Sequence, residues 1–186
     1  MRTFIAVFPP PRIRAAAVAR VREAVRRLGG LADRVRWVRP ENAHLTLKFL
    51  GDVREEVLGD LRVALEKTCA EHAPFYVGLA GFGAFPSARR ARILWAGVGP
   101  GSARLRSLAA DLDAALVPLG FEREERAFAP HLTLGRIRGR PASFDLPPDT
   151  GGLGFRVRHV ELVESMLTPE GAVYRIIQTF ALKERN

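Results

Sequence analysis

The hydrophobic positions along the chain follow two periods, which predict the segments that form strands and those that form helices. Runs of alternating or continuous apolar residues, typical of strands, cover residues 4–8, 75–85, 93–96, 155–167 and 174–182. Three longer stretches repeat apolar residues every three or four positions, as amphipathic helices do, and cover residues 12–28, about 55–71, and 102–116. The chain is therefore predicted to mix helices and strands.

Each predicted helix carries one apolar stripe that should face a core. The stripes are Val18, Val21, Val25 and Leu28, then Leu58, Leu61, Leu65 and Cys69, and last Leu105, Leu108, Leu112 and Leu116. Cys69 is thus predicted to be a small buried residue rather than a nucleophile. Ser102 is the predicted N-cap of the third helix, and Gly29, Gly30 and Gly120 are predicted helix ends.

The order of the elements occurs twice. A strand at 4–8 and a helix at 12–28 precede a His-Leu-Thr-Leu segment at 44–47, and a strand at 93–96 and a helix at 102–116 precede another at 131–134. We infer a duplicated lobe, within one bilobal domain over residues 1–186. Residues 139–153, the only long irregular stretch predicted, interrupt the repeat. Turn residues at 86–90 and 168–171 predict two hairpins.

The composition is that of an ordinary globular protein, with 47% hydrophobic and 26% charged residues among 186. No apolar run approaches the roughly 20 residues of a membrane span, and the apolar start is too short for a secretory signal. We therefore expect a cytoplasmic protein without membrane association. The net charge of +9 is carried mainly by arginine, which favours a phosphate-containing partner; GC-rich codon usage is the alternative explanation.

Both His-Leu-Thr-Leu segments present polar side chains on one face of a strand. Residues two apart in a strand share a face, so His44 and Thr46 point one way, whereas the leucine after each of them points the other. His131 and Thr133 have the same parity. If a pseudo-twofold axis relates the lobes, two imidazoles and two hydroxyls can converge on one cleft.

Two histidines that flank one atom suit general acid–base catalysis, because imidazole exchanges protons near neutral pH. In-line displacement at phosphorus needs a base beside the entering oxygen and an acid beside the leaving oxygen, with ring nitrogens about 6 to 8 Å apart. Thr46 and Thr133 can donate hydrogen bonds to the non-bridging oxygens. Metal binding is the competing use of paired histidines, but no acidic or cysteine ligand lies at metal-site spacing beside either motif. His72 and His159 also lack this context.

The residues around both motifs carry a family resemblance. Residues 35–51 read VRWVRPENAHLTLKFLG, and residues 128–136 read FAPHLTLGR. Together with the opening strand at residue 4 and a closing hairpin over residues 165–180, they resemble the RNA 2′,3′-cyclic phosphodiesterases, once called 2′-5′ RNA ligases, of the two-histidine phosphoesterase superfamily. The resemblance covers essentially the whole chain.

The resemblance implies an α+β fold: two pseudo-twofold-related lobes, each an antiparallel sheet backed by helices, around a central cleft. It also implies opening of RNA 2′,3′-cyclic phosphate ends to 2′-phosphates without a metal or other cofactor. By motif, His44 corresponds to the proton donor to the leaving 3′ oxygen and His131 to the proton acceptor that activates water. Arg136 corresponds to an arginine near the phosphate. Strict alternation would turn Arg136 away from His131, so we expect a bulge or a strand end near Gly135.

Several interpretations remain open at this point. Lys48 shares the parity of His44 and could add charge to the site, or could be a solvated strand-end lysine. Phe8, Trp37 and Phe49 could stack on bases, although core packing is favoured for each. The arginines of the first helix could attract the RNA backbone or form a solvated face.

Two other functions compete with RNA-end hydrolysis. They are hydrolysis of small cyclic nucleotides and RNA binding without turnover. The substrate could include tRNA halves, which the reverse ligation would join through a 2′-5′ bond. We expect no obligate protein partner and a monomer.

Overall fold

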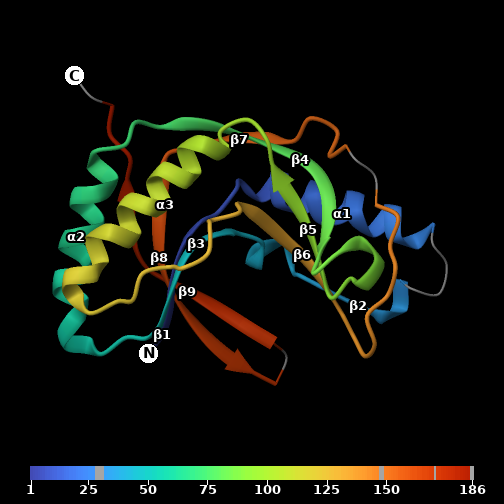
Figure 1. The fold of residues 1–186 in the computed structure, drawn as a ribbon, viewed down its shortest axis with the longest axis horizontal. Helices are drawn as coiled ribbons and strands as arrows, with labels where there is room; N and C mark the ends of the chain where they lie inside the picture. Colours follow the sequence, from blue (N-terminus) through green and yellow to red (C-terminus); the bar gives the residue numbers. More distant parts are fainter. Residues whose placement is uncertain (28–31, 147–148, 170, 185–186) are drawn as a thin grey trace.

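The computed structural model describes residues 1–27, 32–146, 149–169 and 171–184, and within these ranges nine strands form one curled sheet (Figure 1). The elements in chain order are β1 (Arg2–Val7), α1 (Pro11–Arg26), η1 (Ala32–Arg34), β2 (Val35–Trp37), η2 (Pro40–Asn42), β3 (Leu45–Asp52), η3 (Glu55–Val57), α2 (Leu58–Ala70), β4 (Phe75–Phe85), η4 (Ala88–Arg90), β5 (Ile93–Val98), α3 (Ser102–Leu116), η5 (Val117–Leu119), β6 (His131–Ile137), β7 (Gly154–Val157), β8 (His159–Thr168) and β9 (Gly171–Ala181). Every strand pair described is antiparallel.

The predicted helices form, with changes at their ends. In α1 the buried stripe includes Val18, Val21 and Val25; the predicted stripe residue Leu28 and helix ends Gly29 and Gly30 lie outside the described residues. Helix α3 has the predicted bounds and buries all four predicted leucines. The Ser102 prediction was wrong, since the N-cap is Gly101 with a φ of +82°, which glycine tolerates.

The other predicted elements are confirmed with changes of boundary. The helical stretch predicted over about 55–71 begins as η3 and continues as α2, where Leu61, Leu65 and Cys69 are buried and Leu58 is partly buried. Burial raises the pKa of Cys69 to about 12, which disfavours a thiolate. The η5 turn that continues α3 ends at Gly120, which has a φ of +87°.

The strand predicted over 155–167 is two strands. It divides at Arg158 because β7 pairs with β4, whereas β8 pairs with β1 and β9. Both predicted hairpins occur, between β4 and β5 and between β8 and β9. The described part of 139–153 is irregular apart from an Ala91–Ala142 bridge, but a second irregular stretch, 121–130, was not predicted.

The duplication appears in the order of the strands, β7-β4-β5-β6-β3-β1-β8-β9. In this order β3 and β6 lie at the centre, β1 and β5 lie next to them, and β8 and β4 lie outside those. The unit β1-α1-β3 therefore repeats as β5-α3-β6. The outer strands are exchanged, because β4 follows β3 in the chain but pairs with β5, and β8 follows β6 but pairs with β1.

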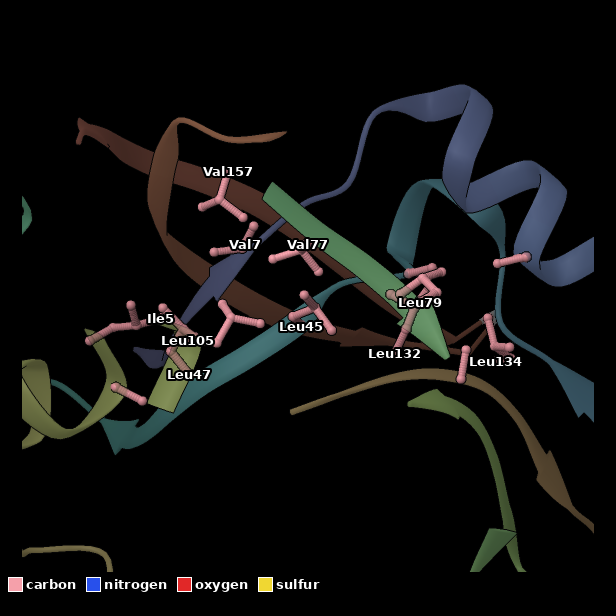
Figure 2. Packing of buried hydrophobic residues seen from close by; sticks show 14 of the residues in the cluster. Ile5, Val7, Leu45, Leu47, Val77, Leu79, Leu105, Leu132, Leu134 and Val157 are labelled. Atoms are coloured by element: carbon pink, nitrogen blue, oxygen red, sulfur yellow. The ribbon is translucent and has the colours of Figure 1, made fainter. Parts of the chain in front are cut away.

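The core lies on one face of this sheet and fixes the orientation of the central strands. Ile5 of β1, Leu45 and Leu47 of β3, and Leu132 and Leu134 of β6 are buried there with Val77 and Leu79 of β4 (Figure 2). Helices α2 and α3 pack together beside the half that contains β3, and α1 lies against the half that contains β6 (Figure 1). None of the described helices combines the length and the apolar character needed to cross a membrane.

Candidate active site

The two His-Leu-Thr-Leu segments meet at the centre of the sheet. Strands β3 and β6 pair through Leu45 opposite Leu132, and both leucines point into the core. Continuing this antiparallel register by one residue sets His44 opposite Thr133 and Thr46 opposite His131. All four of these side chains therefore project from the opposite face, which we call the site face.

This register fixes the spacing of the histidines. His44 and His131 occupy one diagonal of the four positions, and the two threonines occupy the other. The Cα atoms of diagonal neighbours in an antiparallel pair lie about 7–8 Å apart. That separation leaves room for one small tetrahedral group between the two rings, with a hydroxyl on each side of it.

Both imidazoles are held by the same kind of hydrogen bond. Nδ1 of His44 lies 2.7 Å from the carbonyl oxygen of Asn42, and Nδ1 of His131 lies 2.8 Å from that of Ala129. Because a carbonyl oxygen only accepts, Nδ1 carries the proton in each ring. Each Nε2 is thus the nitrogen left to accept or donate a proton at the site face.

A β-bulge after each threonine changes the parity of the residues that follow. Strand β3 pairs Thr46 with Ala6 but Lys48 with Ile5, so Leu47 is the extra residue. Strand β6 pairs Thr133 with Trp95 but Gly135 with Leu94, which is the bulge predicted near Gly135. The residue after each bulge pair, Phe49 or Arg136, returns to the site face.

The first bulge removes Lys48 from the site. Its register partner Ile5 belongs to the core, and Lys48 itself is only 4% exposed. Its ammonium donates to Asp113 of α3 at 2.5 Å and to the carbonyl oxygen of Glu122 at 2.8 Å. The idea that Lys48 adds charge beside His44 is therefore wrong, because alternation fails at the extra residue. The alternative of a solvated strand-end lysine is wrong as well, because Lys48 is buried and paired with Asp113.

His44 lies in a cage of aromatic rings. Phe4 stacks on it at 4.7 Å between ring centroids, Phe8 lies at 5.2 Å, and Tyr174 of β9 meets it edge-on at 5.2 Å. Burial in this cage, followed by the nearby charges of His131 and Arg14, lowers the pKa of His44 to about 4 despite the bond to Asn42. His44 is thus neutral at pH 7 in the ligand-free protein.

His131 has a more open setting. Among the described residues one aromatic ring contacts it, that of Phe85 of β4, edge-on at a centroid distance of 5.0 Å. Trp95 lies opposite Thr133 and over Gly83, where an added Cβ would overlap the indole. In the first half the corresponding partner of Thr46 is the small Ala6. The two halves thus surround matched histidines with different side chains.

Arg136 places a positive charge on the site face, near Tyr174. Its side chain is exposed on β6, and its charge opposes the rise that burial causes in the pKa of Tyr174, a ring of the His44 cage. Thr46 and Thr133 are partly buried. The five residues predicted for the site, His44, Thr46, His131, Thr133 and Arg136, therefore lie on one face.

Sequence reasoning missed most of the aromatic rings that contact the two histidines. Phe4, Tyr174 and Phe85 come from strands far apart in the chain, and no local pattern links them to the histidines. Phe8 is partly buried against His44, and Trp37 packs against the core, but Phe49 is 66% exposed, which contradicts the core packing favoured for it. The alternation of Phe4 and Ala6 on β1 with Phe8 directly after the strand was the available signal.

The remaining histidines lie elsewhere. His72 contacts Asp111 of α3 at 3.0 Å, and His159 is the first residue of β8, where it pairs with Ala181 of β9. No three histidine, cysteine, aspartate or glutamate side chains gather as a metal-binding set in the described ranges. The chemistry that these residues offer at the site face is proton transfer by two imidazoles and anion stabilisation by hydroxyls and an arginine.

Comparisons with known proteins bear on this site. A family model described as "LigT like Phosphoesterase" matches residues 8–95 and 98–174. A protein of Methanothermobacter thermautotrophicus named RNA 2′,3′-cyclic phosphodiesterase is 38% identical over 154 residues, which cover 80% of this chain and 83% of that protein. One of the same name from Archaeoglobus fulgidus is 35% identical over 184 residues, covering 97% and 99%.

Solved structures are similar over the full length. TT0787 of Thermus thermophilus has a TM-score of 0.85 and 34% identity, with 100% of both chains covered. LigT of E. coli, solved in complex with 3′-AMP, has a TM-score of 0.82 and 25% identity, with 98% of both chains covered.

Proposed function

Because the chain belongs to the LigT-like phosphoesterase family, we propose that it hydrolyses RNA 2′,3′-cyclic phosphate ends to 2′-phosphomonoesters. The name shared by its relatives supports the substrate, and they match most of the chain. The observation that carries the proposal is the Leu45–Leu132 pairing, because it supports a common face for His44 and His131 at a diagonal Cα spacing of about 7–8 Å.

The proposed reaction breaks one P–O bond and forms another. His131 accepts a proton from water at Nε2 while the water oxygen attacks phosphorus. The bond from phosphorus to the 3′ oxygen breaks, and His44 donates a proton from Nε2 to that oxygen. The phosphate stays on the 2′ oxygen, and one proton has been transferred at each imidazole.

The other site residues stabilise charge in this scheme. Thr46 and Thr133 would donate their hydroxyl protons to the non-bridging oxygens, whose negative charge grows as the water attacks. Arg136 would face the same charge with a guanidinium. These groups need not gain or lose a proton during turnover.

The low pKa of His44 is compatible with a donor role. An anionic phosphate between the rings favours a proton on His44, since an opposite charge close to an imidazole raises its pKa. Once protonated, a caged imidazolium gives up its proton readily to an alkoxide. The aromatic cage would thus make His44 a stronger acid than a solvated histidine.

The same two proton transfers would join RNA if a 5′-hydroxyl replaced water. His131 would accept the proton of that hydroxyl while its oxygen attacks phosphorus, and His44 would protonate the departing 3′ oxygen. The new bond is a 2′-5′ phosphodiester. We extend the proposal to 2′-5′ ligation of cut RNA such as tRNA halves, by a monomer without an obligate partner or cofactor.

Two competing functions, hydrolysis of small cyclic nucleotides and RNA binding without turnover, can be tested by measuring kcat/KM on substrates of two lengths and by comparing binding with turnover. An enzyme for small cyclic nucleotides would gain nothing from a longer RNA, whereas an RNA enzyme gains in kcat/KM. An RNA-binding module would bind such ends without turnover. Placement of both histidines on one face favours catalysis over binding alone.

A product analysis tests the proposal directly. The protein is incubated with a cyclic-phosphate-ended oligonucleotide and a chelator, and the 2′- and 3′-phosphate products are separated. We expect the 2′-phosphate. A 3′-phosphate product would overturn the assignment of the 3′ oxygen as leaving group, and no product at all would overturn the hydrolase.

A further inference from the structure

A hollow of about 430 Å³ lies beside the site. One side is formed by the end of β1 and the start of α1, and the other by the segment where β7 meets β8. Its apolar walls come from Phe8, the prolines at 9–11 and Phe155. Its polar groups come from Arg14, Arg156, Arg158, His159 and Glu161. The volume falls within the range typical of sites for small ligands.

Phe8 and Arg14 connect the hollow to the candidate active site. The ring of Phe8 lies 5.2 Å from that of His44. The guanidinium of Arg14 lies 5.7 Å from the Phe8 ring centroid, and its charge lowers the pKa of His44. A ligand held between the histidines can therefore extend past Phe8 into the hollow.

The end of the hollow at Arg158 and His159 is too far from His44 to share the phosphate bound there. Extending the strand registers by one or two residues sets His44 on one side of Phe8 and His159 on the other. Two strand spacings amount to about 10 Å. An anion beside Arg158 would thus be a second one, which a cyclic mononucleotide without further phosphates does not have.

The lining residues match a nucleotide. An aromatic ring and three prolines offer flat apolar surface to a base. Arg156 and Arg158, alternate residues of an extended segment, are both exposed. The guanidinium of Arg156 donates to the carbonyl oxygen of Pro74 at 3.3 Å and lies 3.7 Å from Glu184, and both contacts are exposed and weak. Nε of Arg14 and Oε2 of Glu161 are buried and have no hydrogen-bond partner among the described residues.

We propose that this hollow binds the nucleotide that precedes the cyclic end of an RNA strand, with its base against Phe8 and its phosphate at Arg156 and Arg158. The proposal rests on the function proposed above and adds a second subsite, which takes the nucleotide upstream of the cyclic end. Glu161 and Arg14 would offer an acceptor and a donor to the base edge.

The test compares two substrates and two charge-reversed variants. The substrates are a 2′,3′-cyclic mononucleotide and a trinucleotide that ends in the same cyclic phosphate. In the variant R156E/R158E, kcat/KM for the trinucleotide should fall at least tenfold. The value of kcat/KM for the mononucleotide should change less than twofold. The salt dependence of trinucleotide binding should lose about 0.7 in slope, the value of one phosphate contact.

R62E/K67E on α2 is the matched control, because it reverses two exposed charges on another face. In this control variant, kcat/KM for the trinucleotide should fall less than threefold. An equal loss in both variants would overturn the proposal in favour of general attraction, and equal losses on both substrates would place the terminal nucleotide in the hollow instead. Equal wild-type activity on both substrates would also overturn it.

Failure of the proposed function is distinguishable from failure of this subsite. If the wild-type protein hydrolyses neither substrate, the function fails, and anisotropy with a fluorescent 2′-phosphate-ended trinucleotide still reports on the hollow. Binding that R156E/R158E does not weaken would then overturn the subsite.

Discussion

His44 and His131 lie at equivalent points of the two repeats. The repeated segment determines the backbone position of each ring, whereas the neighbouring strands determine which side chains surround it. Each ring is anchored through Nδ1 to the carbonyl two residues earlier, and a bulge follows each threonine. Around these matched backbones, in the part of the chain that the structure describes, the first half places three aromatic rings and the second places one. The repeated segment thus fixes position, and the neighbouring strands tune proton affinity.

The largest effect should come from removing either histidine. H44A and H131A should each lower kcat on a cyclic mononucleotide by at least about 100-fold, since each removes one proton transfer. The double variant should lose little more than either single one, because the two groups act in one step. H72A, far from both motifs, is the control. Parent-like turnover by H44A or H131A would refute the assignment.

Lys48 and Gly135 are equivalent residues, and K48M tests the consequence of the bulge in the first half. Removing Lys48 leaves Asp113, whose side chain is 17% exposed, with only the backbone N–H of Glu124 as a hydrogen-bond donor among the described residues. We expect urea denaturation to show about 3 kcal/mol less stability, with kcat/KM per folded molecule changed less than threefold. A stable variant with a 100-fold loss of activity would return Lys48 to the site.

Phe49 and Arg136 occupy the same place after the two bulges, and this pair tests the asymmetry of charge. R136A should lower kcat/KM about 100-fold, because it removes a cation from the developing negative charge, and R136K should restore part of it. F49A should change kcat/KM on a mononucleotide less than threefold. Similar losses in F49A and R136A would mean that the two halves contribute alike.

Opening the cage should raise the pKa of His44. In Y174A, His44 becomes more solvated, so its pKa should rise from about 4 toward the ordinary value near 6.5. Titration of the imidazole C–H resonances by NMR measures this, with H44A used to assign the signal. A pKa that stays near 4 would show that the cage is not its cause.

A smaller effect concerns Glu161, which faces Ala6 across β1 and β8. Burial raises its pKa to about 7, above the unfolded value near 4.5, so the stability it contributes is present below pH 4.5 and is lost as the pH rises through 7. E161Q should therefore raise the melting temperature by a few degrees at pH 8 and not at pH 4.5. An equal change at both pH values would contradict this.

Local sequence patterns were sufficient for features that depend on one segment. The parity of His44 and Thr46 against two leucines, and the stripe of α3, follow from residues close in the chain, and both are found. Gly135 indicated the second bulge in the sequence. No comparable residue marks the bulge at Leu47, so the face on which Lys48 lies was predicted wrongly.

Features that depend on neighbouring strands could not be predicted in this way. Nothing near residues 155–167 shows that β7 pairs with β4 while β8 pairs with β1, which divides the segment at Arg158. The contact of Tyr174 with His44 likewise depends on where the last hairpin lies. Periodicity gives the face on which a residue lies, whereas the identity of its neighbour is set by tertiary pairing.

The exchange of outer strands has a consequence for how the molecule loses its structure. Strand β5 of the second repeat pairs with β4, which follows the first repeat in the chain, and β1 of the first repeat pairs with β8, which follows the second. Each half is therefore completed by the other, and heating should melt them in a single cooperative transition rather than one after the other.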